Sequence, residues 1–232
     1  MESILKRIIN KVNTASIDPK PSDNIYIEDI FDSATYLDIL TRLPADENYN
    51  FIEHPDAVLP DGTVTRKLLD LTDETIKKFP SNDQAFWHQM KDALTSDILQ
   101  KIIMQKFYGK IKARYGEDWP QVVTVPVFYR DFPGYRITPH TDAPFKIATM
   151  QFYFPKDDSQ MHLGTSFLER KGNQFELLKT NQFKPNSAYA FARTDESWHC
   201  VQEIPAHESP RNTLALTLFV KGYEYKSTKE YV

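Results

Sequence analysis

Residues 138–144 of this chain, TPHTDAP, place His140 and Asp142 two positions apart. In a β-strand, side chains at positions i and i+2 point to the same face and lie about 7 Å apart along the chain. An imidazole and a carboxylate arranged in this way can converge on one metal ion. The pair is a short motif that also arises by chance, so its meaning depends on a third ligand elsewhere in the chain.

A candidate third ligand, His199, lies in the segment ESWHCVQ (196–202), shortly before the last strand-like stretch. Two histidines and one carboxylate on one face of an octahedron form the facial triad of non-haem Fe(II) oxygenases, which leaves neighbouring coordination positions open. An all-oxygen set would suit Mg²⁺ or Ca²⁺, and an all-His or Cys set would suit Zn²⁺. The mixed set of His140, Asp142 and His199 therefore favours Fe(II).

The part of the chain around this motif is predicted to be β-structure. From residue 118 onward, short segments rich in β-branched and aromatic residues are separated by Pro, Gly, Asn and Asp clusters. The predicted strands are VVTVPVFYRDF (122–132), PFKIATMQFYF (144–154), TSFLER (165–170), QFELLKT (174–180), NSAYAFA (186–192) and RNTLALTLFV (211–220). Short strands at this spacing are typical of a barrel or jelly roll.

The N-terminal half is predicted to be mainly helical. Apolar residues recur at helical spacing near Ile8 and near Ile39, and a short strand, IYIEDIF (25–31), separates these two stripes. Residues 83–115 are predicted to form two helices with a cap at Thr95 or Ser96. We therefore expect one α+β domain over residues 1–232. Its parts are helical support and lid elements (1–117), a β-barrel core (118–222) and a tail (223–232).

A charged residue, Arg211, begins the apolar final strand. Such a charge is costly inside a barrel unless it has a buried partner, and a guanidinium can form a bidentate pair with a carboxylate. Thr213 shares a face of that strand, so both residues could hold the carboxylate of a bound ligand. By the same alternation, three residues of the predicted strand 144–154 should line one wall: Thr149, Gln151 and Tyr153.

The order of these residues resembles the prolyl-hydroxylase-like branch of the 2-oxoglutarate/Fe(II) oxygenase superfamily. The pattern is Tyr-x₁₀-His-x-Asp, then a distal His, then an Arg on the last strand, and it covers Val122–Val220. The segments that carry it are FYRDFPGYRITPHTDAP, QFYFPKDD, LGTSFL, KPNSAYAF, SWHCVQE and PRNTLALTLF. The first 117 residues match no motif of a member with a defined substrate, so the resemblance does not extend to the substrate.

This resemblance implies a double-stranded β-helix, or jelly-roll, core. It implies Fe(II) on His140, Asp142 and His199, with 2-oxoglutarate on Arg211 and O₂ as the oxidant. Tyrosines that contact the co-substrate in this branch correspond to Tyr129 and Tyr153, beside Gln151 and Thr213. Related halogenases replace the carboxylate ligand by a small residue, so Asp142 predicts hydroxylation.

The substrate is expected to be a small polar molecule, either an anionic metabolite or an amino-acid-like compound. Arg130 and Arg136 flank the first ligand strand and are candidates for binding it. The segments DFPGYRIT (131–138) and NYNFIEHPDAVLPDGTVTR (48–66) are predicted to cover the metal opening, because long irregular segments commonly carry such a function.

Two other functions compete with this interpretation. One is a jelly-roll module that binds a sugar or peptide without catalysis, and the other is a cupin-type metal dioxygenase that does not use 2-oxoglutarate. Neither needs an inward-facing arginine on the last strand, so the side chain of Arg211 separates them from the oxygenase. If Arg211 is not the anchor, Arg193 is the next candidate.

Composition limits the remaining possibilities. The 232 residues are 41% hydrophobic with a net charge of −4, a globular composition without the basic surplus of a nucleic-acid-binding domain. No stretch approaches the roughly 18 apolar residues of a membrane span, and Cys200 has no partner for an internal disulfide. We expect a cytoplasmic protein whose partner is a small molecule, and the sequence gives no oligomeric state. His54, His88, His162 and His207 are expected to be structural or surface residues.

Overall fold

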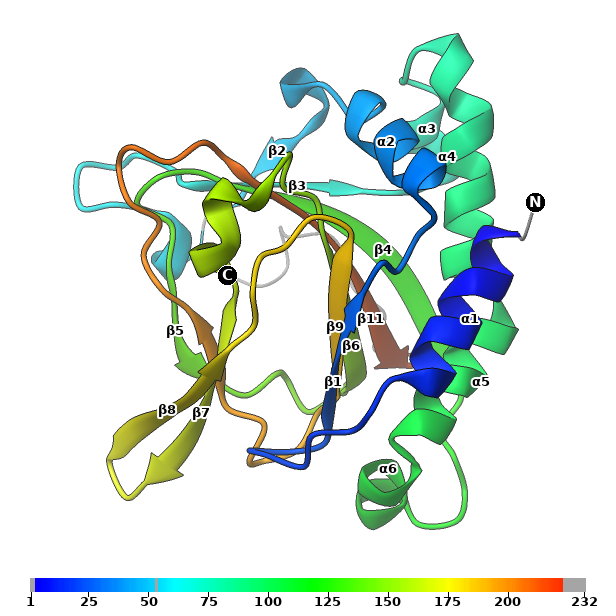
Figure 1. The fold of residues 1–232 in the computed structure, drawn as a ribbon. Coiled ribbons are helices and arrows are strands. Elements are labelled where there is room, and N and C mark those ends of the chain that lie inside the picture. The colour runs from blue at the N-terminus through cyan, green and yellow to red at the C-terminus, as the bar shows by residue number, and fades with distance from the viewer. Residues whose placement is uncertain (1–2, 53, 223–232) are drawn as a thin grey trace.

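The computed structural model describes residues 3–52 and 54–222 as two antiparallel sheets beside a layer of helices (Figure 1). The α-helices are α1 (Ile4–Thr14), α2 (Ser33–Thr41), α3 (Asp73–Ile76), α4 (Ser81–Leu94), α5 (Asp97–Lys106) and α6 (Tyr108–Tyr115). The 3-10 helices are η1 (Asp46–Asn48), η2 (Pro55–Ala57) and η3 (Asp158–Leu163). The strands are β1 (Asn24–Glu28), β2 (Asn50–Phe51), β3 (Arg66–Asp70), β4 (Val122–Asp131), β5 (Ile137–His140), β6 (Lys146–Tyr153), β7 (Thr165–Lys171), β8 (Gln174–Thr180), β9 (Ser187–Ala192), β10 (His199–Val201) and β11 (Arg211–Val220).

Strands from the second half of the chain are divided between the two sheets. The large sheet has the order β1-β9-β6-β11-β4-β3-β2, and the small sheet has the order β5-β10-β7-β8. Strands β4, β6, β9 and β11 thus form the centre of the large sheet, and three strands from the N-terminal half extend its two edges. The predicted α+β character is confirmed. The predicted tail, residues 223–232, lies outside the described residues.

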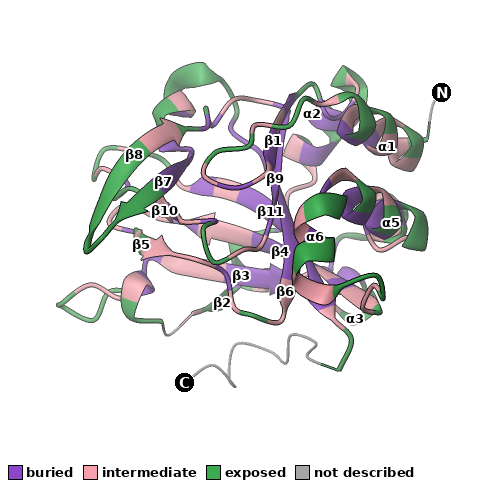
Figure 2. Ribbon diagram, turned by 90° about the horizontal axis from the view of Figure 1, so that it is seen from below, coloured by how far each residue is buried: buried purple, intermediate pink, exposed green. Residues whose placement is uncertain are grey.

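The outer face of the large sheet is covered by helices of the N-terminal half. Figure 2 shows that these helices turn their buried sides toward the sheet and their exposed sides outward. Ile8 and Val12 of α1 and Trp87 of α4 are buried in one core cluster together with Leu216 of β11. The helical stripe predicted around Ile8 therefore packs as expected. Ser96 caps α5, because its hydroxyl accepts a hydrogen bond from the backbone N–H of Leu99.

Two features of the N-terminal half differ from the prediction. Residues 83–115 lie in three helices, because the chain turns at Phe107 between α5 and α6. The segment expected to be irregular contributes β2 and the first residue of β3. Strand β3 pairs with the edge of β4 and buries Leu68 and Leu69. Among the residues that the structure describes, no helix combines the length and the apolar character needed to cross a bilayer.

A second core cluster fills the space between the two sheets. It is largely aromatic and contains Tyr135, Tyr153, Phe167, Phe183, Tyr189 and Phe191. These rings occupy one part of the space between the sheets, and two cavities lined by polar residues adjoin them. The layered arrangement therefore places those cavities between the large and the small sheet.

Gly164 should tolerate no side chain. A Cβ atom there would lie 1.5 Å from the backbone oxygen of Asn181, and the N–H of Asn181 is hydrogen-bonded to Thr165 at 2.9 Å. We expect Gly164→Ala to lower the free energy of unfolding by about 1–3 kcal/mol, as overpacking does. Gly109→Ala in α6, with no atom within 4 Å of its Cβ, should raise it by about 0.5 kcal/mol. Urea unfolding of both variants checks this, and equal effects would contradict it.

Candidate metal centre and adjoining cavities

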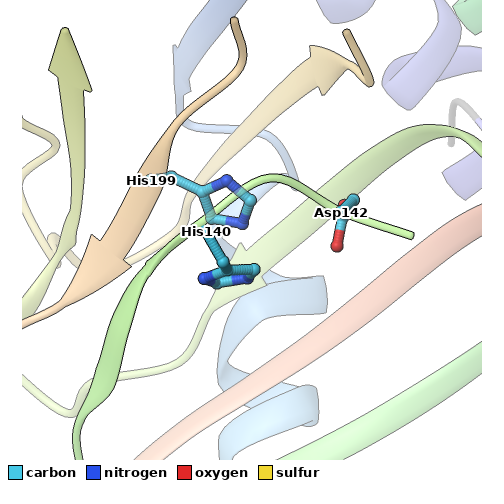
Figure 3. A group of neighbouring side chains, drawn as sticks. All are labelled: His140, Asp142 and His199. Atoms are coloured by element: carbon cyan, nitrogen blue, oxygen red, sulfur yellow. The ribbon is translucent and has the colours of Figure 1, made fainter. Parts of the chain in front are cut away.

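The three predicted metal ligands lie together. His140, the last residue of β5, is directly paired with His199, the first residue of β10, across the small sheet. Asp142 follows two residues after β5, and the ligand atoms of all three side chains lie within 4.8 Å of one another. Figure 3 shows the two imidazole rings next to each other, with Asp142 further along the segment that leaves β5. The strand spacing and the cross-strand pair together build the triad.

Backbone contacts fix both imidazoles in one tautomer. The Nδ1 of His140 lies 2.9 Å from the carbonyl of Thr138, and the Nδ1 of His199 lies 2.9 Å from the carbonyl of Ser197. A carbonyl can only accept, so each Nδ1 carries the hydrogen and each Nε2 keeps its lone pair for a metal. Burial lowers the pKa of His140 and lowers the pKa of His199 to about 4. Both rings are therefore neutral ligands at pH 7.

The carboxylate of Asp142 is held from two sides. Its Oδ1 accepts a hydrogen bond from Lys146 at 2.6 Å, and its Oδ2 accepts one from Thr149 at 2.9 Å. Burial alone would raise the pKa of Asp142, but the charge and hydrogen bond of Lys146, together with the two neighbouring histidines, outweigh burial and hold that pKa well below its usual range. The Nε of Arg193 donates to the backbone carbonyl of Asp142 at 2.9 Å. Two neutral imidazoles and one ionised carboxylate suit a divalent first-row metal ion such as Fe(II).

An inner cavity of about 120 Å³ extends from the triad into the space between the sheets. Arg211 lines it and is fully buried, with its Nε donating to the carbonyl of Leu163 at 2.8 Å. Its Nη1 donates to Asp131 at 2.7 Å, whereas its Nη2 is buried and has no hydrogen-bond partner among the residues that the structure describes. The inward-facing arginine on the last strand is thus present, and one of its nitrogen atoms is left for a ligand.

The polar residues predicted around the co-substrate form one hydrogen-bonded chain. Tyr153 donates to Thr165, Thr165 to Tyr189, Tyr189 to Gln151, and Gln151 to Thr213, at 3.1, 3.0, 2.6 and 2.8 Å. Gln151, Thr165 and Tyr189 line the inner cavity. Tyr153 and Thr213 are fully buried and are not among the lining residues. The prediction of direct co-substrate contact is therefore corrected for these two, which support the wall from behind.

Tyr129, the other predicted tyrosine, lines both cavities. The outer cavity has a volume of about 300 Å³ and shares Arg66, Lys146 and the first two metal ligands with the inner one. Both segments predicted to cover the metal opening contribute residues to the wall of this cavity. Its remaining wall is largely apolar and includes Ile52, Ala57, Leu68, Phe145 and Phe219.

The two arginines predicted to bind substrate do not line either cavity. Tyr129 faces the cavities, so its neighbour Arg130 points to the opposite side of β4, where it contacts Asp46 and Asn212. Arg136 is 63% exposed and pairs with Glu203. The substrate prediction is therefore wrong for Arg130, because adjacent residues of a strand point to opposite faces, and for Arg136, because its side chain lies on the surface.

Four functional candidates were missed in the sequence: Arg66, Asp131, Lys146 and Tyr189. Lys146 could have been found, since it lies four residues after Asp142 with the opposite charge. Arg66 and Asp131 have no local signal, because their contact depends on the pairing of β3 with β4.

The remaining histidines are located as follows. His54 was expected to be structural, but it lies at the outer cavity. His88 pairs with Asp73 on the surface. His162 and His207 are exposed and lie near Glu208.

A scan of the sequence against protein-family models finds no match, and a comparison with curated proteins finds none either. Comparison of the structure with solved structures does find matches. A Pseudomonas putida prolyl-4-hydroxylase is 12% identical, with a TM-score of 0.57, and 94% of this chain and 100% of that chain are covered. A prolyl 4-hydroxylase from Phytophthora capsici is 14% identical, with a TM-score of 0.56, and 96% and 68% are covered. The α-ketoglutarate-dependent epimerase SnoN from nogalamycin biosynthesis is 9% identical, with a TM-score of 0.53, and 98% and 87% are covered.

These matches establish the fold. The chain has the prolyl-hydroxylase-like fold of 2-oxoglutarate-dependent oxygenases, as the order of its motif residues predicted. The identities are low, and the matched proteins include both hydroxylases and an epimerase. Since one fold hosts many activities, function has to be argued from the site of this chain.

Proposed function

We propose that the protein is an Fe(II)- and 2-oxoglutarate-dependent oxygenase that hydroxylates a small polar molecule. Its core would be a double-stranded β-helix formed by β4–β11, with the N-terminal half as part of the same unit. A cytoplasmic location is also proposed, since the one cysteine, Cys200, is a free thiol.

The observation that carries this proposal is a single cavity shared by two kinds of side chain. The triad His140, Asp142 and His199 lines one end of the inner cavity, and Arg211 lines it as well. Arg211 and Arg66 share the one carboxylate of Asp131, at 2.7 and 2.8 Å. This leaves a buried excess of one positive charge, which an anion would neutralise. A dicarboxylate that chelates the metal and reaches Arg211 meets both requirements.

The residues of the chain would contribute as follows. His140, Asp142 and His199 would hold Fe(II), which supplies the activation of O₂ and the oxidation of the substrate. The backbone carbonyls of Thr138 and Ser197 keep the two imidazole rings in their orientation. Lys146 and Thr149 do the same for the carboxylate of Asp142. Arg211 would anchor the distal carboxylate of 2-oxoglutarate. Tyr129 and Gln151 would line its binding site, supported from behind by Thr213 and Tyr153.

The walls of the two cavities would exclude water. Residues of the segments 48–66 and 131–138 line the outer cavity beside the metal ligands, where they would shield a reactive oxidant from side reactions. Arg211 favours the oxygenase over a jelly-roll binding module and over a cupin-type dioxygenase. In either alternative, its buried Nη2 would have no role.

The direct test is an anaerobic titration of the purified protein with Fe(II) and 2-oxoglutarate. A metal-chelated keto acid gives a weak visible charge-transfer band, which we expect to saturate at one equivalent. Metal binding without this band would favour the cupin-type dioxygenase, and no metal binding would favour the binding module.

Arg211→Lys should weaken 2-oxoglutarate binding by about 1.5–3 kcal/mol, or roughly 10- to 150-fold, because lysine cannot reproduce the charge-assisted contacts of the guanidinium. Iron affinity should stay nearly unchanged. The charge-transfer titration measures both, and Arg136→Lys on the exposed surface is the matched control. An unaltered 2-oxoglutarate affinity would assign the anchor to another residue, of which Arg66 is the first to test.

A further inference from the structure

Arg66 lies where the inner and outer cavities meet, and it comes from a part of the chain outside the metal-binding strands. It lines both cavities and begins β3, which lies between β4 and the edge strand β2 of the large sheet. Ile52, Asp56 and Leu68 of the same N-terminal region form much of the outer wall. The metal and co-substrate residues thus come from β4–β11 and the segments between these strands, whereas the N-terminal region supplies part of the wall against which a substrate would lie.

The guanidinium of Arg66 is fixed in place before any ligand binds. The rings of Tyr129 and Tyr135 cover this guanidinium, and their centroids lie 4.0 and 4.5 Å from its central carbon atom, Cζ. Its Nε faces Asp131 at 2.8 Å, and its Nη1 donates to the hydroxyl of Tyr135. Its Nη2 has no hydrogen-bond partner among the described residues. An immobilised guanidinium with one unused NH₂ group binds an oxyanion at little cost in conformational entropy.

Charge in the assembled site also leaves room for an anion. Arg66, Arg211 and Lys146 are the cationic residues that line the inner cavity. With Fe(II) and 2-oxoglutarate bound, the metal ion and these three cations would carry five positive charges, against four negative charges on Asp131, Asp142 and the two carboxylates of 2-oxoglutarate. The net charge at the inner cavity would then be +1. Besides Asp142, the outer cavity is lined by the carboxylate of Asp56. Asp56 lies near His54 and accepts a hydrogen bond from Thr138.

We propose that Arg66 binds an oxyanion group, a carboxylate or a phosphate, on a small-molecule substrate whose apolar body lies against Ile52, Leu68 and Phe219. This inference rests on the proposed oxygenase function and names its substrate class. A volume of about 300 Å³ is at the lower end of the range for small-molecule sites. Arg66 takes the place of the exposed arginines that were expected to bind the substrate.

The test measures binding without turnover. Protein loaded anaerobically with Fe(II) and 2-oxoglutarate is titrated by calorimetry with hexanoate, hexanamide, hexyl phosphate and hexanol, and with phenylacetate and phenylacetamide. We expect at least one anion to bind tenfold or more tightly than its neutral counterpart. Whether carboxylates or phosphates bind more tightly identifies the group. Arg66→Gln should reduce the anion preference to within twofold, Arg66→Lys should retain part of it, and Arg136→Gln should leave it unchanged.

The outcomes separate this inference from the proposed function. If the loaded wild-type protein binds no anion more tightly than its neutral partner, Arg66 is not a substrate receptor. If Arg66→Gln keeps the anion preference and instead loses tenfold or more in 2-oxoglutarate affinity, Arg66 belongs to the co-substrate anchor and the inference is overturned. Failure of the wild-type protein to bind 2-oxoglutarate with Fe(II) would instead overturn the proposed function. Arg66→Gln leaves Asp131 paired with Arg211, and thermal unfolding confirms that the variant is folded.

Discussion

Replacing Asp131 with asparagine should lower the free energy of unfolding by about 3–5 kcal/mol, the range for removing one partner of a buried ion pair. Asp131 and Arg211 are fully buried, and Arg66 is only 16% exposed. The three residues are cross-strand neighbours on β3, β4 and β11. Without the carboxylate, two guanidinium groups would face each other with no anion between them, and arginine does not lose its proton in proteins.

Urea unfolding with the metal-free protein measures this effect. Asp46→Asn is the matched control, because Asp46 also contacts two cations, Lys67 and Arg130, but is 51% exposed. It should cost no more than about 1 kcal/mol, as exposed ion pairs do. Arg66→Gln should be milder than Asp131→Asn, since it leaves a one-to-one pair. Equal losses of stability for Asp131→Asn and Asp46→Asn would mean that Arg66 and Arg211 do not need the carboxylate of Asp131 between them.

The second large effect concerns the metal. His140→Ala, Asp142→Ala and His199→Ala should each reduce Fe(II) affinity by more than about 100-fold, beyond the roughly 10–100-fold typical of a residue that only orients a ligand. The oxygenase activity should fall to background with the affinity. Removing either histidine leaves no buried charge behind, because both rings are neutral at pH 7, so these variants should still fold.

Metal content after anaerobic loading, together with calorimetric titration, gives the comparison. His162→Ala, which alters an exposed histidine paired with Glu208, serves as the control and should bind iron like the wild type. Retention of stoichiometric iron and full turnover by two of the three triad variants would show that the metal is held elsewhere.

Sequence patterns predicted the elements whose residues act through local spacing. The i, i+2 relation of His140 and Asp142, the helical stripe of α1 and the cap at Ser96 all depend on neighbours within a few residues. The face that a strand turns inward depends on its partners instead. Because Tyr129 was predicted to face the cavity, the alternation of side chains along the strand already directs Arg130 to the opposite face.

Contacts between distant segments could not be read in the same way. Asp131 meets Arg66 and Arg211 only because β4 lies between β3 and β11. No periodic signal marks β3 as a strand, because its apolar residues Leu68 and Leu69 are adjacent and do not alternate with polar ones. Tyr189 lines the cavity, whereas Tyr153 does not. Tyr189 reaches this position because β9 pairs with β6 in a register that places Tyr189 opposite Gln151, which also lines the cavity.

The position of His140 at the end of β5 links metal binding to local unfolding. Within the described part of the chain, β5 is the edge strand of the small sheet and pairs only with β10, through an irregular register. Few hydrogen bonds therefore hold it, and short edge strands open more readily than central ones. A metal bound to His140, Asp142 and His199 would join β5, the segment after it and β10 at one point, like a cross-link. Fraying of β5 and release of the metal would then be the same event, and amide hydrogen exchange in this strand would be governed by metal occupancy.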